Sequence, residues 1–248
     1  MKAPRERAPP QGLIRDMQRW RGEEPAQRTY PTRMQLKGLI LDLDGTLVDS
    51  LDSISHAYIA AVREVSGRTC TFDEVVSTLP IGPGETILTA LLGRPSTSDD
   101  LACYHRHFEA GISGVTCYSG VPEALREVAA SVPVAVFTGG GRTGAELLLG
   151  HTGLRRYISA LVCGDEVARA KPAPDGVRSA CEAVGVGPAE AAYVGDARRD
   201  LESARAAGVL AVAAAWGHEY DAEAPADVVL ETPSDLIALV RGSATDGC

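Results

Sequence analysis

Two aspartates separated by one residue, Asp42 and Asp44, follow directly after a short apolar run. The stretch from Lys37 to Ser50 reads KGLILDLDGTLVDS, and an apolar run that ends at a Gly–Thr turn predicts a buried strand opening into a loop. Side chains alternate along an extended chain, so both carboxylates are expected on one side, where they repel each other. A divalent cation such as Mg²⁺ would relieve this repulsion. One carboxylate can then act as a nucleophile and the other as general acid and base. The competing structural interpretation is a helix cap and a turn residue.

A second polar feature, the run TGGG at residues 138–141, follows the apolar residues 132–137. The hydroxyl group of Thr138 and the N–H groups of Gly139 and Gly140 could hold phosphate oxygens at the start of a helix. On its own, Thr138 is better explained as a helix N-cap.

A lysine and a second pair of aspartates complete the set of candidate residues. Lys171 precedes Pro172 in a predicted loop, in a chain with three lysines and twenty-one arginines, so a lysine here is unexpected on composition. A compact ammonium group can bind an aspartate nucleophile and a phosphate together. Asp196 follows the apolar stretch AAYVG, and Asp200 lies one helical turn further on, so both can face one site.

Alternating strands and helices must position these residues. Apolar runs bounded by turn residues predict strands at residues 39–41, 132–138, 160–163, 191–195, 209–215 and 227–230. Helical patterns lie between them, at residues 121–130, from 143, at 174–184, at 198–207 and from 234. This alternation predicts a doubly wound parallel α/β sheet, in which ligands bind at the carboxyl ends of the strands.

Residues 51–115 contain helical patterns and no convincing strand. Helices are predicted at residues 51–66, 71–79 and 98–112, with another ending at Leu92; Gly67 should end the first, and Thr71 with Glu74 forms a capping-box pattern. We therefore expect a catalytic core at 36–50 and 116–248, with a small all-helical cap at 51–115 inserted after the first strand.

The charge distribution separates residues 1–35 from the rest of the chain. These residues carry eight Lys and Arg and four Asp and Glu. The other residues carry sixteen Lys and Arg and twenty-nine Asp and Glu, which is a net charge of −13. An acidic body argues against nucleic acid as a partner. The basic, Pro-rich segment predicts a flexible arm, and Met34 is either an alternative start or an internal residue.

No signal-peptide or membrane-spanning pattern is visible, so we expect a cytoplasmic protein with no membrane partner. Six cysteines without a CxxC pair indicate reduced thiols, and Cys103, His105 and His107 do not match zinc-ligand spacings.

In order along the chain, the candidate residues form the pattern DxDGT, Thr, Lys-Pro, GDxxxD. Over about residues 36–240 this resembles the haloacid dehalogenase-like (HAD) phosphatases, and the helical insert and the stretch SARAAGVLAVAAAWG resemble the phosphoglycolate phosphatase group. The resemblance implies that Asp42 is a nucleophile that becomes an aspartyl-phosphate and that Asp44 is the general acid and base. It also implies Mg²⁺ binding by Asp42, Asp196 and the main-chain carbonyl of Asp44, phosphate binding by Thr138 and Lys171, and support from Asp200.

Two positions depart from the family pattern. Gly139 stands where relatives often have Asn, and Ala197 where they often have Ser or Thr. Both departures concern the positioning of the substrate and leave the reaction itself unaffected.

Several alternatives share the fold. Asp44 argues against a dehalogenase, and the absence of lysine from residues 51–118 argues against a phosphonoacetaldehyde hydrolase. A phosphosugar mutase and a pyrophosphatase or nucleotidase stay open, whereas the presence of every motif carboxylate and of the lysine argues against a non-catalytic binding module.

For specificity, the candidates are Gly82 and Glu85 in the loop 81–85 and Arg142 after the second motif, with Arg68 and Arg94 behind them. The arginines favour a small anionic phosphate monoester, a phosphorylated metabolite resembling phosphoglycolate, because guanidinium binds carboxylate or phosphate in a bidentate manner. We expect the enzyme to be a monomer or a homodimer.

Overall fold

The computed structural model describes residues 36–242. Its centre is a six-stranded, fully parallel sheet in the order β5-β4-β1-β6-β7-β8. The strands are β1 (Gly38–Leu41), β4 (Val134–Phe137), β5 (Ala160–Val162), β6 (Ala191–Gly195), β7 (Leu210–Ala214) and β8 (Val228–Leu230). The predicted fold class is confirmed. The predictions for residues 1–35, including Met34, lie outside the described part of the chain.

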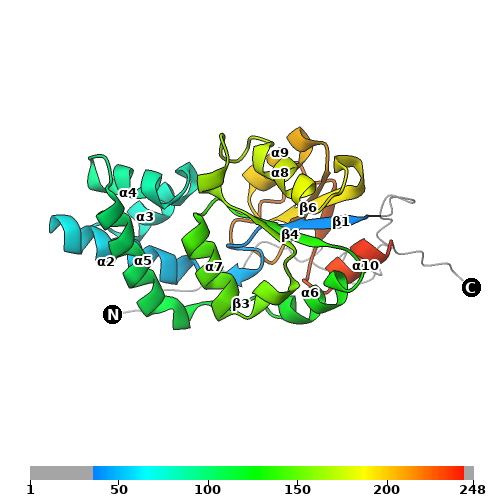
Figure 1. Cartoon of the computed structure of the whole chain (residues 1–248), viewed down its shortest axis with the longest axis horizontal. Helices are drawn as coiled ribbons and strands as arrows, with labels where there is room; N and C mark the ends of the chain where they lie inside the picture. The colour runs from blue at the N-terminus through cyan, green and yellow to red at the C-terminus, as the bar shows by residue number, and fades with distance from the viewer. Residues whose placement is uncertain (1–35, 243–248) are drawn as a thin grey trace, which may run out of the picture. The chain divides into compact units, whose positions relative to one another are not determined.

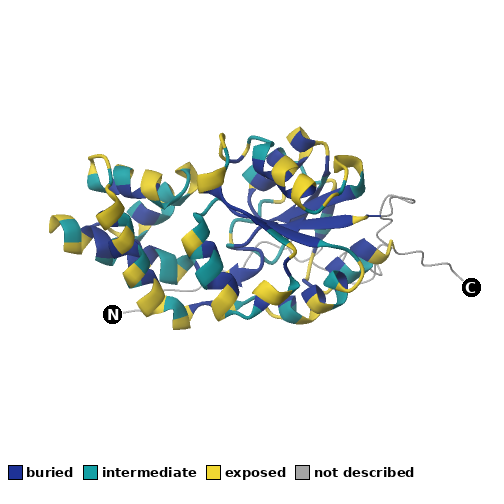
Figure 2. Cartoon of the chain, in the orientation of Figure 1, coloured by how far each residue is buried: buried dark blue, intermediate teal, exposed yellow. Residues whose placement is uncertain are grey.

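Helices cover both faces of the sheet (Figure 1). One face contacts α8 (Asp175–Ala183) and α9 (Arg198–Ala207), and α6 (Val121–Ala129) and α10 (Asp235–Arg241) pack together on the other. Parallel strands covered on both faces are apolar along their whole length. This explains why β1, β4 and β6 are buried at every residue, as Figure 2 shows in dark blue.

Five of the six strands begin or end one or two residues from the predicted position, and two of them show why. The strand predicted from residue 132 begins at Val134, after Pro133, which has no N–H group to contribute to a sheet. Asp227 lies just before β8, where its carboxylate accepts a hydrogen bond from the N–H group of Ala211 at 2.9 Å. A proline or a polar residue therefore marks the true first residue of these strands more closely than the apolar pattern, which predicted longer strands.

The cap consists of α2 (Leu51–Ser66), α3 (Phe72–Thr78), α4 (Gly84–Leu92) and α5 (Ser98–Gly111). Its two connections to the core run through β2 (Val48–Asp49) and β3 (Thr116–Cys117), which pair in an antiparallel ribbon. Strands of two residues leave no apolar periodicity, which is why the sequence did not predict this ribbon.

Local signals set the ends of the cap helices. The predicted capping box forms, with Thr71 Oγ1 accepting a hydrogen bond from the N–H group of Glu74. Gly67 ends α2 with a φ of 71°, in the left-handed region that favours glycine.

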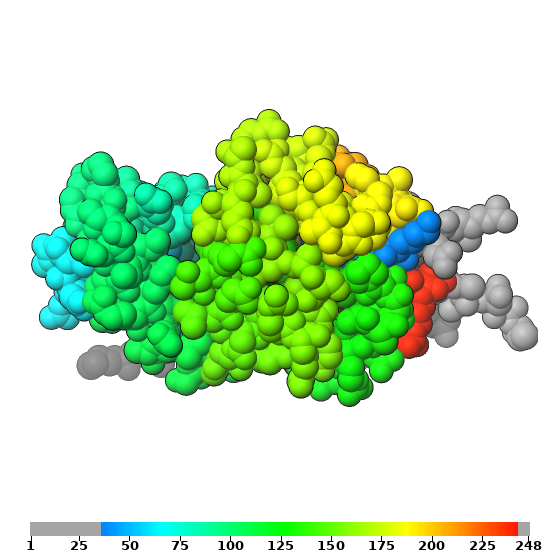
Figure 3. Space-filling model, viewed as in Figure 1, coloured from blue at the N-terminus to red at the C-terminus, as the bar shows by residue number. Residues whose placement is uncertain are grey.

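The cap lies at the carboxyl ends of the strands, where the arrow of β1 points toward it (Figure 1). In the space-filling view the cyan and green surface of the cap meets the core segment that carries α7 (Arg142–His151) (Figure 3). Phe108 of α5 makes this contact, with its ring 4.0 Å from the position that a Cβ atom on Gly144 would take. No helix within residues 36–242 is both long enough and apolar enough to cross a bilayer.

Candidate active site

Three neighbouring strands of the sheet deliver the candidate residues to one place. β1 pairs with β4 on one side and β6 on the other, and Leu41 lies beside both Val136 and Val194. Because the three strands end together, Asp42, Thr138 and Asp196 come together at one edge of the sheet. A cavity between this edge and the cap is lined by Asp42, Asp44, Thr138, Gly139 and Lys171.

Lys171 links two buried carboxylates at this edge. Its Nζ atom lies 2.6 Å from Asp42 Oδ1 and 2.7 Å from Asp200 Oδ1. Burial by itself would lower the pKa of Lys171, but the two carboxylates outweigh it and hold the pKa above its usual value. The ammonium group also lies over the rings of Phe137 and Tyr193, 4.9 and 5.4 Å from their centroids. The lysine is therefore charged and fixed in position beside Asp42.

Burial raises the pKa of Asp42 well above its usual value, although Lys171 opposes this shift. The nearby carboxylates of Asp200 and Asp196 raise it further. A nucleophile must be ionised, so this carboxylate needs more positive charge than the lysine supplies.

Asp200 is held on the side facing away from the cavity. Its Oδ2 accepts a hydrogen bond from the N–H group of Ala197 at the start of α9, at 3.1 Å. The hydroxyl group of Tyr193 donates to Asp200 Oδ1 at 3.2 Å and to the carbonyl group of Phe137 at 3.0 Å. The sequence left open whether Asp200 supports a metal or the lysine, and the structure places it on the lysine.

Asp196 is enclosed by main-chain and side-chain donors. Thr46 Oγ1 donates to its Oδ1 at 3.2 Å, and the N–H group of Glu219 donates to its Oδ2 at 3.0 Å. Burial raises the pKa of Asp196 to about 6. Gly45 of the DxDGT motif has a φ of 82°, and a Cβ atom there would lie 2.4 Å from Asp196 Oδ2. Glycine is thus required both by the backbone conformation and by the approach of this carboxylate.

Asp42, Asp196 and Asp200 each place a carboxylate oxygen within 4.8 Å of the others. These hard oxygen donors suit Mg²⁺, and three buried carboxylates lie close together here beside one ammonium group, that of Lys171. Asp200 already has three partners, the ammonium group of Lys171, the hydroxyl group of Tyr193 and the N–H group of Ala197, so Asp42 and Asp196, which have fewer, are the better candidate ligands. The residues present fit a bound Mg²⁺ ion.

Asp44 is held by two hydroxyl groups. Ser50 Oγ donates to Asp44 Oδ1 at 2.5 Å, and Thr138 Oγ1 donates to Oδ2 at 3.3 Å. Burial raises the pKa of Asp44, and the two hydrogen bonds and Lys171 oppose that shift. A positioned carboxyl group whose pKa is raised is suited to proton transfer.

The TGGG run takes up a more specific arrangement than the sequence predicted. The N–H group of Gly140 donates to Thr138 Oγ1 at 3.0 Å, so it is already used within the loop and is not directed at a phosphate. Thr138 thereby connects this loop to Asp44. A Cβ atom on Gly139 would have no neighbour within 4 Å, so this position leaves open space in the cavity wall.

The specificity residues divide into two groups. Gly82 and Glu85 line the cavity. The guanidinium group of Arg142 instead pairs with Glu166 and Glu146 and donates to the carbonyl group of Leu161 at 2.8 Å. Arg142 is not among the cavity-lining residues, so its predicted contact with substrate is wrong. The reason is tertiary packing, which brings Glu166, 24 residues away in sequence, against the guanidinium group, where it and Glu146 satisfy the charge.

The two secondary arginine candidates are also engaged elsewhere. Arg68 pairs with Glu74 and with the carbonyl group of Leu91. Arg94 binds Asp100 through both guanidinium nitrogens, at 2.6 and 3.0 Å. Neither residue lines the cavity.

Four functional positions were missed by sequence reasoning: Ser50, Thr46, Tyr193 and Arg199. Ser50 and Thr46 lie within the stretch that includes the two motif aspartates, so their closeness in sequence was a usable signal. Tyr193 occupies a position of β6 that looks like an ordinary core residue. Arg199 is one of twenty-one arginines and carries no distinguishing sequence signal.

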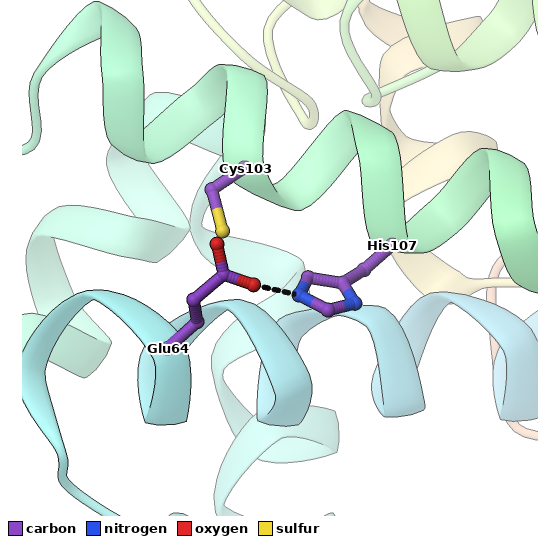
Figure 4. Close-up of side chains that lie close together, drawn as sticks. All are labelled: Glu64, Cys103 and His107. Atoms are coloured by element: carbon purple, nitrogen blue, oxygen red, sulfur yellow. Dashed lines mark hydrogen bonds and ion pairs between the residues drawn. The ribbon is translucent and has the colours of Figure 1, made fainter.

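A second cluster of polar side chains lies away from the cavity, between α2 and α5 (Figure 4). His107 Nε2 lies 2.7 Å from Glu64 Oε2, and Arg106 Nη2 lies 2.9 Å from Glu64 Oε1. Burial raises the pKa of the Cys103 thiol, and its hydrogen bond to Glu64 raises it further, so it stays protonated. Glu64 already has three partners and Cys103 is no thiolate, so we interpret the cluster as a link between two helices and not as a metal site.

The comparisons with known proteins agree with this geometry. The sequence model described as haloacid dehalogenase-like hydrolase matches residues 39–214. The N-acetylmuramic acid 6-phosphate phosphatase of Pseudomonas aeruginosa is 30% identical over 227 residues, which cover 86% of this chain and 99% of the relative. The phosphoglycolate phosphatase of Thiobacillus denitrificans is 32% identical over 202 residues, which cover 77% of this chain and 87% of the relative.

Among solved structures, a predicted phosphoglycolate phosphatase from Haemophilus somnus superposes with a TM-score of 0.68. It is 23% identical, and the match covers 83% of this chain and 98% of that one. At this level of identity the match shows a shared fold.

Proposed function

The chain belongs to the haloacid dehalogenase-like hydrolase family, and from this premise we propose that it is a Mg²⁺-dependent phosphatase acting on a small phosphate monoester. Asp42 is the nucleophile in this proposal and carries an aspartyl-phosphate intermediate. One observation supports the proposal most strongly: Asp42 faces the cavity, Lys171 lies 2.6 Å from it, and Asp44 lines the same cavity with its two oxygens held by hydroxyl groups.

In the first step, an oxygen of Asp42 attacks phosphorus and the bond to the leaving alcohol breaks. Lys171 holds Asp42 in place and favours its ionised form, and its charge offsets part of the repulsion between a carboxylate and a phosphate dianion. Asp44 donates a proton to the departing oxygen, so that an alcohol leaves instead of an alkoxide.

In the second step, water attacks the phosphorus of the aspartyl-phosphate. Asp44, now ionised, accepts the proton of the attacking water, and Asp42 is released as a carboxylate. Ser50 and Thr138 hold Asp44 in one orientation through both steps, because each hydroxyl binds a different carboxylate oxygen.

The carboxylates of Asp42 and Asp196, with the main-chain carbonyl group of Asp44, would hold Mg²⁺. When bound, the ion supplies the additional positive charge that offsets the repulsion between nucleophile and phosphate.

The cavity lies beneath the cap, so a free phosphorylated metabolite fits the site and a phosphorylated side chain of a folded protein does not. We expect release of inorganic phosphate. A phosphosugar mutase would instead return a phosphorylated sugar, and product analysis with sugar phosphates distinguishes the two.

Trapping of the phosphoenzyme tests the proposal. Acetyl phosphate needs no protonation of its leaving group, so the Asp44→Asn variant should be phosphorylated by it and lose the phosphoryl group slowly. Acid quenching followed by reductive labelling and mass spectrometry should place the modification on residue 42. The same treatment of Asp42→Asn should give no label. A phosphoryl group on another residue, or none in Asp44→Asn, would overturn the mechanism.

A further inference from the structure

The cavity extends well beyond the place where phosphate would bind. Its volume is about 470 Å³, and its lining includes residues from α2, α4, α5 and α7 as well as the catalytic loops. Cavities of this size accommodate a whole small molecule. The residues that surround the leaving group should therefore indicate its chemistry.

The cap side of the cavity is apolar and aromatic. Tyr58 and Tyr104 stack with ring centroids 4.0 Å apart, and Phe108 lies next along α5, 5.9 Å from Tyr104. Both tyrosines line the cavity and are otherwise buried, so the part of each that faces a ligand belongs to a packed aromatic cluster. Ile54, Ile87 and Leu101 complete this wall.

Cations are scarce in the cavity, and each is already matched by a carboxylate. Within residues 36–242, the cavity-lining Lys and Arg residues are Lys171 and Arg199. Lys171 binds Asp42 and Asp200, and both guanidinium nitrogens of Arg199 bind Glu219, at 2.5 and 3.1 Å. A second anionic group on a substrate would therefore find no unpaired lysine or arginine among these lining residues.

Three further titratable groups of the lining, Glu85, Asp165 and His105, add no cation. Glu85 and Asp165 add negative charge to the lining. His105 also lines the cavity, and its burial lowers its pKa, so at neutral pH it is uncharged. His218, the other histidine of the lining, lies with Nδ1 3.4 Å from the hydroxyl group of Tyr118.

The position of Gly139 adds room at the phosphate end of the cavity. Because a Cβ atom there would meet nothing within 4 Å, the space beside the phosphate site can take part of a bulky group. The small residue, the apolar wall and the absence of an available cation all favour the same kind of substrate.

We propose that the physiological substrate is the phosphate ester of an uncharged, bulky alcohol with an aromatic or branched aliphatic body that packs against Tyr58, Tyr104 and Leu101. This inference rests on the proposed phosphatase function. It replaces the sequence-based expectation of a small anionic ester, which depended on arginines that do not line the cavity. Burying a carboxylate without a counterion is costly, whereas burying apolar surface against these side chains is favourable.

Three phosphate esters of primary alcohols test the inference: benzyl phosphate, 4-carboxybenzyl phosphate and phosphoglycolate. Because each leaving group is a primary alcohol, differences in kcat/KM report mainly on contacts beyond the phosphate. We expect benzyl phosphate to exceed both carboxylate-bearing esters by about tenfold or more. Equal values, or a preference for either anionic ester, would overturn the inference.

Two cap variants separate charge from shape. Glu85→Gln removes an exposed carboxylate and should raise kcat/KM for 4-carboxybenzyl phosphate about two- to fivefold, with a smaller change for benzyl phosphate. Leu101→Arg places a cation in the wall and should shift the preference further toward the anionic ester, whereas Leu101→Met, which conserves volume, should not. If Glu85→Gln changes both esters equally, the charge argument is wrong.

Acetyl phosphate distinguishes the failure of this inference from the failure of the proposed function. Its small acyl group makes no use of the apolar wall, so its hydrolysis reports on the core residues alone. Hydrolysis of acetyl phosphate without a preference for benzyl phosphate would overturn only the substrate inference. No hydrolysis of any of the four compounds with Mg²⁺ present would overturn both.

Discussion

The core and the cap use charge in opposite ways. The core buries Lys171, Asp42, Asp196 and Asp200, each less than one-tenth exposed, at the ends of its strands. The cap keeps its ion pairs outside the cavity, as in the cluster around Glu64, and turns aromatic and aliphatic side chains toward the cavity.

Under the proposed function, this difference separates the residues that carry out phosphoryl transfer from those that recognise the leaving group. Phosphoryl transfer requires charges at fixed positions, and burial among partners supplies them at a cost in desolvation. Recognition of an apolar leaving group requires only shape and the absence of charge, which a small bundle of helices provides. The predictions below test whether the two regions are independent in this way.

The largest expected effect is in the core. Asp42→Asn should abolish turnover, because an amide is a very poor nucleophile and enzymes accelerate phosphate monoester hydrolysis by up to ~10²¹-fold. Phosphate release measures the loss, and circular dichroism checks that the fold is intact. Asp52→Asn, an exposed aspartate in the first turn of α2, is the matched control and should keep normal activity. Appreciable activity in Asp42→Asn would remove the residue from the mechanism.

Removal of the metal should stop the reaction almost as completely. With EDTA we expect no phosphate release, and Mg²⁺ should restore it. Ca²⁺ should inhibit, because its looser coordination disturbs the geometry of attack. Asp196→Asn should raise the Mg²⁺ concentration needed for half-maximal activity. Full activity in chelator would contradict the assignment of Asp42 and Asp196 as ligands.

The variants Lys171→Met and Arg106→Met compare a buried cation of the core with an exposed cation of the cap. Lys171→Met leaves Asp42 and Asp200 buried without a counterion, so we expect a loss of roughly 3–5 kcal/mol in unfolding free energy, together with loss of activity. Arg106→Met removes an exposed partner of Glu64 and should change stability far less. Urea denaturation of the two variants measures the contrast. Similar losses would mean that the two regions do not differ as proposed.

A smaller, pH-dependent effect is expected at the start of α5 in the cap. The hydrogen bonds from Arg94, followed by that from the N–H group of Thr97, lower the pKa of Asp100 well below its usual value. Because the folded protein binds this proton less readily than the unfolded chain, the stabilisation is complete above about pH 5 and declines as the pH falls below about 4.

Asp100→Asn should therefore be less stable than wild type at pH 7, and the difference should narrow at pH 3.5. Thermal melts at the two pH values provide the measurement, with the exposed neighbour Asp99→Asn as control. Phosphatase activity at pH 7 and 25 °C should be unchanged, since the pair lies outside the cavity. If the stability difference between wild type and Asp100→Asn were larger at pH 3.5 than at pH 7, the assigned direction of the Asp100 pKa shift would be wrong.

Local patterns predicted much of this molecule. The apolar runs located all six strands of the sheet, and Gly67 and the Thr71–Glu74 capping box set helix ends where expected. Polar residues at strand ends also predicted which side chains meet, because parallel strands with aligned ends bring their following residues together. Asp42 and Lys171 are 129 positions apart, yet both were identified from motif and strand order.

The sequence by itself therefore determined the sheet, the cap insertion and the edge of the sheet where the candidate residues meet, since strand periodicity, capping and motif spacing are properties of neighbouring residues. Only the tertiary structure decided that Arg142 pairs with Glu166 and does not line the cavity, that Asp200 contacts Lys171, and that the cap side of the cavity is apolar. A guanidinium group binds whichever carboxylates packing brings closest, and a cavity wall is assembled from faces of several helices. These outcomes depend on contacts between distant segments, which no local pattern records.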